Sequence, residues 1–421
     1  MRIRIILILC VCCLIPATAK ADEIASLASQ VRELTQLVKD LKLTVDQQQR
    51  EITGLKQINE LKSQAPAAPA VPIYQQPRPN KPFLEVGAVA DVALKLDSPK
   101  VDQGGADRVS VRELELVLGS NVDPYSRLDA TVAFNEQNTA ELEEAYLTRF
   151  GLPLDLTVRI GRFKPRIGKD LALHRDSLDT VDEPLVIQRY FGEEGVNKSG
   201  VDVTKLIDIP SLMVHQLTVG VLEGGTGEGG TAFGSTKRRP TLYTHLKNYL
   251  DITDMTNLEI GVSDAIGSRD EDVTFEVNIL GLDVTLIHYL NPNQSIKLQS
   301  EVFYQNRTES FTISEIPEGS GRFFKNDLDG TLWGGYELFD FRFNSQWALG
   351  FRFDDVELVD NPVTNPNKGD IGYSGYLTFY QSEFARWRVQ FSHFDLATGK
   401  DDNQVLIQGT FAIGDHKHKL Q

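Results

Sequence analysis

Residues 154–166 have the sequence LDLTVRIGRFKPR. Leucine, valine and isoleucine occupy the even positions from 154 to 160, whereas Asp155, Thr157 and Arg159 stand between them. Because successive side chains of a strand point to opposite faces, this pattern predicts a strand with one apolar and one charged face. In a soluble sheet the charged face would meet bulk water, whereas in a membrane barrel the apolar face meets lipid and the charged face a wet lumen.

The same alternation recurs along residues 83–421, where no segment has the pattern of an amphipathic helix. Residues 84–96 are apolar at every even position, and residues 113–116 alternate glutamate with leucine. On the order of 14–18 such segments follow one another, at the spacing expected for tilted membrane strands joined by short turns and long loops. We expect the polar segments 224–239 and 306–329 to be outer loops.

Residues 1–21 have the organisation of a secretory signal peptide. A basic start at Arg2 and Arg4 precedes the apolar residues 5–15, and residues 19–21, AKA, fit the small-x-small cleavage pattern. Export, a strand array without helices, and aromatic residues near strand ends together favour a membrane barrel over a soluble sandwich. We therefore predict an all-β fold over residues 83–421, a transmembrane antiparallel β-barrel.

The composition excludes several other classes of protein. The formal net charge is −16. The charged side chains within residues 1–21 are all basic, so the exported chain is more acidic still. Such a charge argues against nucleic-acid binding. A hydrophobic content of 41% is too high for a disordered chain. Every cysteine lies within residues 1–21, so we expect no disulfides after export.

Residues 22–62 contain a heptad repeat of apolar residues, which predicts a coiled coil. Residues with β-branched side chains occupy one seam position and leucines the other, a pattern that favours a dimer. The alternative is a single amphipathic helix lying on the barrel or the membrane. The predicted oligomerisation residues are Leu27, Val31, Leu34, Val38, Leu41, Val45, Ile52 and Leu55. Residues 63–82 are rich in proline and are expected to be an extended linker.

Four motifs carry a resemblance to a known family. Residues 159–165, RIGRFKP, are similar to a hydrophobic–Gly–x–Phe/His–Lys–x–Pro block of the porin O/P family, the phosphate-selective outer-membrane porins. Residues 111–119, 144–147 and 406–414 resemble three other strands of that family. The chain departs from the family pattern at Arg166 and at its end, which lacks the usual terminal aromatic residue. The resemblance implies a trimeric barrel of about 16 strands.

The function implied is passive diffusion of phosphate, polyphosphate or other small anions across the outer membrane of a Gram-negative-type cell, with the coiled coil in the periplasm. Anion pores use rings of Arg or Lys, because forked guanidinium groups and ammonium point charges both attract phosphate. The pore-lining residues predicted from strand parity are Arg127, Arg159, Arg342, Arg352, Arg386 and Arg388. A second predicted group, in the segment where the family narrows its pore, is Arg162, Lys164, Arg166, Lys169, Arg175 and Arg189.

Each of these groups also has a purely structural interpretation. Residues 164–190 can form a solvated turn instead of a constriction, since runs of charge usually remain wet. The arginines on the strands can be neutralised in ion pairs with Asp129, Glu144 or Asp354, which would leave little net field in the lumen.

Other motifs give no evidence of catalysis. Residues 225–230, GTGEGG, match a dinucleotide fingerprint but lack the helix pattern that should follow it. His416 and His418 offer two ligands, too few to close a metal site. We therefore predict no enzyme activity, no cofactor and no metal. The expected partners are small anions, outer-membrane lipid, further copies of the chain and a periplasmic partner of the coiled coil. The rival function is an envelope-organising anchor tethered through that coiled coil.

Overall fold

The computed structural model describes residues 84–97, 108–135, 139–234, 239–269, 276–314, 323–359 and 368–414, and their side chains except those of 309–329. The chain divides into two units, Met1–Pro77 and Arg78–Gln421, and every described residue belongs to the second. The predicted signal peptide, coiled coil and proline-rich linker, with all the predicted oligomerisation residues, lie outside the described residues. So do His416 and His418.

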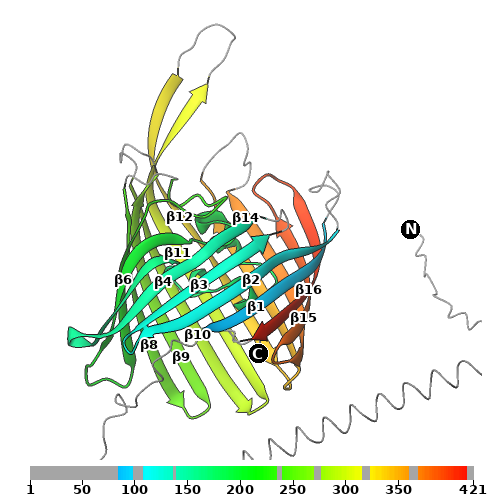
Figure 1. Ribbon diagram of the computed structural model, residues 1–421. Helices are drawn as coiled ribbons and strands as arrows, with labels where there is room; N and C mark the ends of the chain where they lie inside the picture. The colour runs from blue at the N-terminus through cyan, green and yellow to red at the C-terminus, as the bar shows by residue number, and fades with distance from the viewer. Residues whose placement is uncertain are drawn as a thin grey trace, which may run out of the picture. The chain divides into compact units, whose positions relative to one another are not determined.

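The described residues form a closed barrel of antiparallel strands in which each strand pairs with its neighbours in sequence and β1 pairs with β16 (Figure 1). The predicted antiparallel barrel of about 16 strands is confirmed. The strands are β1 (Glu85–Leu96), β2 (Arg108–Asp123), β3 (Ser126–Asn135), β4 (Ala140–Leu152), β5 (Leu156–Phe163), β6 (Lys198–Ile207), β7 (Val214–Leu222), β8 (Thr241–Thr253), β9 (Thr256–Ser268), β10 (Glu276–Asn291), β11 (Gln294–Ser314), β12 (Phe323–Arg342), β13 (Trp347–Glu357), β14 (Gly369–Ser382), β15 (Ala385–Asp395) and β16 (Asp401–Gly414).

The two faces of the barrel have the opposite character from those of a soluble sheet. In β10 the side chain of Leu282 is half exposed on the outside, while its neighbour Asp283 is 1% exposed on the inside. The adjacent strand repeats this arrangement with Val262 outside and Ser263 inside. The sequence alternation therefore directs apolar side chains outward and polar side chains inward, as in an outer-membrane barrel.

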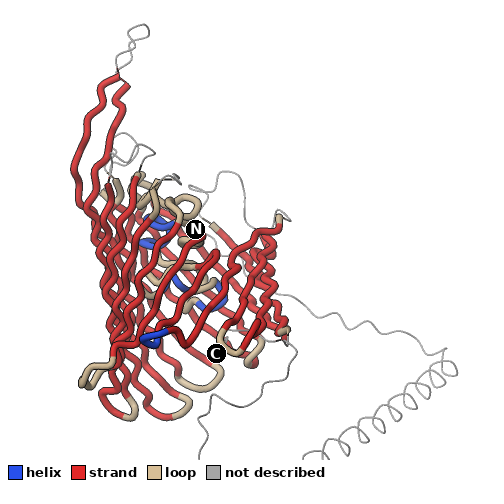
Figure 2. The backbone as a smooth tube through the Cα atoms, turned by 60° about the vertical axis from the view of Figure 1, so that its left-hand side comes forward, coloured by secondary structure: helices blue, strands red, loops and turns tan. Residues whose placement is uncertain are grey.

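The hairpin of β11 and β12 continues beyond the rim of the barrel (Figures 1 and 2). Residues 308–314 pair with residues 323–329 in a regular antiparallel register. The expectation of an outer loop over 306–329 is therefore wrong for these two segments. Residues 323–329 lack the apolar alternation of the barrel strands, but two strands that pair with each other outside a membrane do not require it.

Helical segments are few and short among the described residues. They are η2 (Pro153–Asp155), η3 (Asp170–Ala172), η4 (Arg175–Ser177) and η5 (Ile187–Phe191). None of the described helices combines the length and the apolar character needed to cross a bilayer.

Candidate functional site: an inward-folded segment and its cavity

Residues 164–197, which connect β5 to β6, fold into the barrel, and the short helices of this connection lie within the ring of strands (Figure 2). We call residues 164–197 the inward segment. Ile167, Leu171 and Ile187 of this segment are at most 1% exposed. They belong to one apolar cluster with residues of the inner wall, such as Tyr243 and Phe303. The aromatic inner wall gives this segment an apolar surface to bury against, so it does not form a solvated turn.

Polar side chains of the wall accept hydrogen bonds from the backbone of the inward segment. Glu301 accepts from the backbone N–H of Lys169 at 2.8 Å. Gln390 accepts from that of Val181 at 2.8 Å, and Asp354 accepts from Leu185 N–H at 2.9 Å. An irregular segment inside a barrel would otherwise bury unpaired N–H groups, which is costly. These wall residues therefore determine where the segment lies.

Three of the predicted arginines bind the carbonyl groups of the same segment. Arg386 donates to Asp176 O at 2.8 Å, and Arg388 to Leu178 O and Thr180 O at 3.1 and 2.7 Å. Arg352 donates to Asp182 O at 2.7 Å and pairs with Asp354 at 2.8 Å. All three lie on the inner wall, yet each is at most 3% exposed. These three arginines therefore lie between the wall and the inward segment, bind the segment and do not face open water.

The other arginines predicted from strand parity contact acidic or aromatic side chains. Arg159 pairs with Asp202 at 2.6 Å, and its guanidinium carbon lies 3.9 Å from the centre of the Phe163 ring. Arg127 pairs with Glu85 and, at 2.9 Å, with Asp129. Arg342 lies 4.4 Å from the centre of the Tyr380 ring. Asp129 and Asp354 thus form ion pairs with strand arginines, as the structural interpretation expected. Glu144 instead accepts a hydrogen bond from the inward segment.

The second predicted group divides between the wall and the inward segment. Arg162 has the same strand parity as the exposed Ile160, and its guanidinium lies 3.5 Å from Glu141. The basic residues of the inward segment each have a polar partner. Their contacts are Lys164 Nζ with Leu173 O at 3.0 Å, Arg166 with Thr204 at 2.9 Å, Lys169 with Glu259 at 2.6 Å, Arg175 with Glu194 at 3.0 Å, and Arg189 with Asp370 at 2.6 Å.

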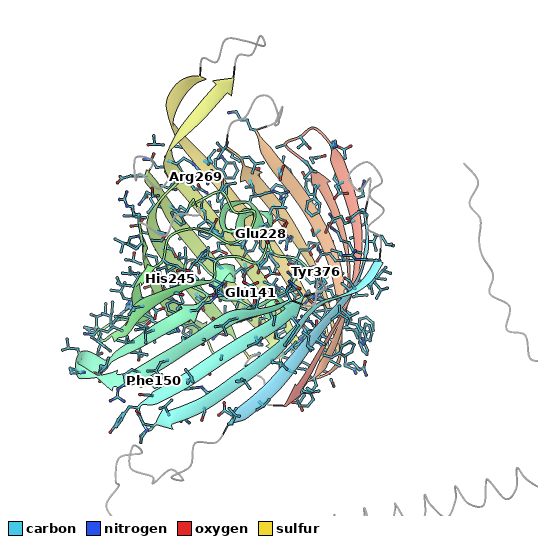
Figure 3. All side chains as sticks on the ribbon, turned by 45° about the horizontal axis from the view of Figure 1, so that its top comes forward. Glu141, Phe150, Glu228, His245, Arg269 and Tyr376 are labelled. Carbon is cyan, nitrogen blue, oxygen red and sulfur yellow. The ribbon has the colours of Figure 1, made fainter. Side chains whose placement is uncertain are left out.

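A second connection folds against the inward segment. Gly227 N–H donates to Phe191 O at 2.8 Å, and Glu193 N–H donates to Glu228 O at 3.0 Å. Glu228 accordingly lies within the outline of the barrel in Figure 3. The segment 224–239, expected as an outer loop, is thus directed inward over residues 226–233, whereas Arg239 pairs with the exposed Glu276 at 2.8 Å. Its glycines permit this close approach, since a Cβ at Gly227 would lie 2.0 Å from Gly195 O.

A cavity of about 560 Å³ remains between the inward segment and strands β1, β2, β4, β15 and β16. The basic side chains that line it are Lys95, Arg108, Arg112, Lys164, Arg175 and Arg189. Carboxylates line the same space, among them Glu193 and Glu194. Several of the cations are paired, as in Arg112 with Asp91 at 2.6 Å, so their fields partly cancel. The cavity therefore has a mixed charge.

Two β-bulges bring additional charged side chains to this cavity. Between β1 and β2 the register shifts so that Arg112 is the extra residue, and between β3 and β4 the extra residue is Glu143. A bulge turns two consecutive side chains toward the same face, here Arg112 with Glu113 and Glu143 with Glu144. Strand parity alone cannot find such residues, and the sequence analysis did not predict them.

The bulge on β4 contributes to a buried cluster around His174 of the inward segment. Nε2 of His174 lies 3.2 Å from Glu144, and Nδ1 lies 3.4 Å from Glu143 and 3.7 Å from Glu115. Burial lowers the pKa of His174, but the three surrounding carboxylates outweigh burial and raise the pKa well above its usual value. The cluster therefore favours a positive charge. Its members come from three separate parts of the chain, so no local spacing in the sequence indicated it.

Glu183 of the inward segment should make stability depend on pH. Burial raises the pKa of Glu183 to about 8; Asp170 raises it further, while Lys164, Arg175 and Arg352 oppose the shift. The native state then retains this proton from about pH 5 to about pH 8, whereas the unfolded chain loses it. The free energy of unfolding should fall as pH rises through this window.

Glu183→Gln should flatten that fall. Denaturant titrations of the detergent-solubilised protein at several pH values, followed by tryptophan fluorescence, would measure it. Glu193→Gln, at an exposed position of the same cavity, is the matched control and should leave the slope unchanged. A wild-type slope that Glu183→Gln does not alter would contradict the prediction.

Comparison with known proteins identifies the fold of the chain. No family model matches the chain. An uncharacterized protein of Aquifex aeolicus is 27% identical over 332 residues, which cover 72% of this chain and 68% of that protein. Among solved structures, the outer membrane channel DcaP of Acinetobacter baumannii is similar with a TM-score of 0.50 and 11% identity, over 79% of this chain and 97% of that one. An anion-selective porin from Comamonas acidovorans also gives a TM-score of 0.50, with 7% identity over 79% of this chain and all of that one. The chain therefore has the fold of outer-membrane porins.

Proposed function

We propose that this chain is an outer-membrane porin of a Gram-negative-type cell that passes small hydrophilic solutes by diffusion. The observation that carries the proposal is the reversed barrel, with leucine and valine exposed outside and aspartate, arginine and serine inside. A closed ladder of this kind leaves no unpaired strand edge, so it can lie in lipid. The inward segment narrows the lumen and leaves a polar cavity beside it.

Small anions, with phosphate or polyphosphate among them, are the solutes that we propose it favours. The basic residues lining the cavity, the resemblance of residues 159–165 to phosphate-selective porins, and the shared fold with an anion-selective porin support this choice. Eight carboxylates line the same cavity beside the six basic residues, so most of the positive field is cancelled. We therefore expect a modest preference for anions and not a strict one.

The reversal potential of single channels in planar bilayers under a salt gradient tests this proposal. A sign that corresponds to anion preference is expected, and Arg108→Gln at the lining of the cavity should reduce it. Arg149→Gln is the control, because Arg149 pairs with Asp123 at an exposed site away from the cavity. A cation-preferring sign would refute the anion proposal, and absence of any conductance would refute the channel.

The second candidate is an envelope-organising anchor, which is favoured by the heptad repeat of residues 22–62. The repeat also supports a homo-oligomer: its seam favours a dimer, while the family resemblance implies a trimer. Deletion of residues 22–82 separates the two functions. We expect the deleted protein to conduct like the full mature chain while its oligomeric state, measured by light scattering in detergent, becomes smaller. Detachment of the envelope together with unchanged conductance would show that anchoring is the main function.

A further inference from the structure

Three buried side chains beside the cavity surround a point at the distances of metal ligands. His174 Nδ1 lies 3.7 Å from Glu115 Oε1 and 3.4 Å from Glu143 Oε2, and all three ligand atoms lie within 4.8 Å of one another. Each residue is at most 7% exposed. Zinc lies about 2.0–2.2 Å from imidazole nitrogen and carboxylate oxygen. Ligand atoms separated by these distances can enclose an ion with bonds of that length.

The opposite side of the imidazole has the partner that metal-bound histidines usually have. Nε2 of His174 lies 3.2 Å from Glu144 Oε2. The other oxygen of Glu144 accepts a hydrogen bond from Lys164 N–H at 3.0 Å, which fixes the carboxylate. A carboxylate on the far ring nitrogen keeps the proton of the neutral ring on Nε2, so a metal ion binding at Nδ1 would displace only the second proton of His174. The four groups thus have the arrangement of a carboxylate–histidine–metal site.

The charge and the hydrogen bonding of the cluster also favour a bound cation. Glu143 Oε2 is buried, faces His174 Nδ1 and makes no hydrogen bond within the described part of the chain. Four carboxylates gather here, those of the residues above and Glu113, whereas the nearby cations are Lys164 and Arg175. With a neutral imidazole and all four carboxylates ionised, the cluster would hold two more negative than positive charges. A divalent cation would balance them without protonating a carboxylate.

We propose that Glu115, Glu143 and His174 bind one divalent first-row transition-metal ion. Imidazole together with carboxylate suits zinc, manganese and iron(II) better than calcium or magnesium, which prefer oxygen ligands alone. Glu143 lines the cavity, so the open coordination position is accessible to water and to the entering ion. Because His174 belongs to the inward segment and the two glutamates to β2 and β4, the ion cross-links the segment to the wall.

Zinc binding to the purified, detergent-folded protein tests the proposal. All variants carry His416→Ala and His418→Ala, so that the terminal pair cannot contribute. After treatment with a chelator and addition of zinc, we expect one equivalent per chain to remain after gel filtration, measured by elemental analysis. Glu143→Gln and His174→Gln should abolish retention, while Glu144→Gln should weaken binding by about 10–100-fold in a calorimetric titration.

His393→Gln is the matched control, because Nε2 of His393 lies 3.3 Å from Asp395 in an exposed pair outside the cluster. It should retain the full equivalent. X-ray absorption of the zinc-loaded protein should show one imidazole and oxygen ligands only, a result that does not depend on whether any variant folds. No stoichiometric zinc, or retention unchanged by both Glu143→Gln and His174→Gln, would overturn the proposal. These measurements involve no transport, so they are independent of the proposed channel function.

Discussion

Arg352→Met is expected to lower the free energy of unfolding of the barrel by about 3–5 kcal/mol, since it leaves the buried Asp354 carboxylate without its cation. Both side chains of this pair have no exposed surface. The substitution also removes the hydrogen bond from Arg352 to Asp182 O, so the inward segment loses one of its attachments to the wall. Conductance should therefore become noisier and higher than in the wild type.

Denaturant titration and single-channel recording would measure the two effects. Arg149→Met is the control, because Arg149 pairs with Asp123 in a half-exposed ion pair that should contribute only about 0–1 kcal/mol. Combining Arg352→Met with Asp354→Asn should restore part of the stability, since the uncompensated charge disappears. A cost for Arg352→Met that is no larger than that for Arg149→Met would contradict the role assigned to the buried pair.

Replacement of residues 164–197 by an Asn-Gly turn is expected to produce the largest change in conductance. Phe163 and Lys198 already pair across β5 and β6, so a two-residue turn can join them without altering the register. Without the segment, nothing on this connection would fill the lumen, and barrels of this size then enclose an aqueous channel. Single-channel conductance and the size of the largest permeant sugar should both rise.

The stability of this variant should fall, because Tyr243 and Phe303 lose the apolar side chains that cover them. The matched control replaces residues 208–214 with the same turn, since Ile207 pairs with His215 and the connection is exposed. It should conduct like the wild type. Heat-modifiable migration on gels would verify that both variants form barrels. Unchanged conductance after removal of the inward segment would show that the segment does not limit flow.

Alternation was sufficient to predict the barrel, because a period of two directly assigns each strand residue to the inside or the outside. It placed Arg352 and Arg388 on the inner wall for this reason. It failed wherever the register shifts, as at Arg112 and Glu143, because a bulge reverses parity without any mark in the alternation. The metal cluster proposed around His174 depends on one of these bulges.

The role of the wall arginines was less predictable than their position. Arg386 binds a carbonyl 210 residues away in the chain, and no local pattern encodes so distant a contact. The sequence analysis assigned these guanidinium groups to passing anions, but the carbonyls of the inward segment occupy them. Their part in anion binding stays a prediction. Three of the predicted residues, Lys164, Arg175 and Arg189, line the cavity. They do so together with residues such as Arg108 and Glu193, which sequence reasoning did not select.

The pairing of β1 with β16 has a consequence for biogenesis. Gly87 and Gly414 are partners in this ladder, although almost the whole domain separates them along the chain. Until β16 has been synthesised, β1 has an unpaired edge and the sheet cannot close into a barrel. Closure of the barrel must therefore wait for β16, and a chain truncated before residue 401 should remain an open, aggregation-prone sheet.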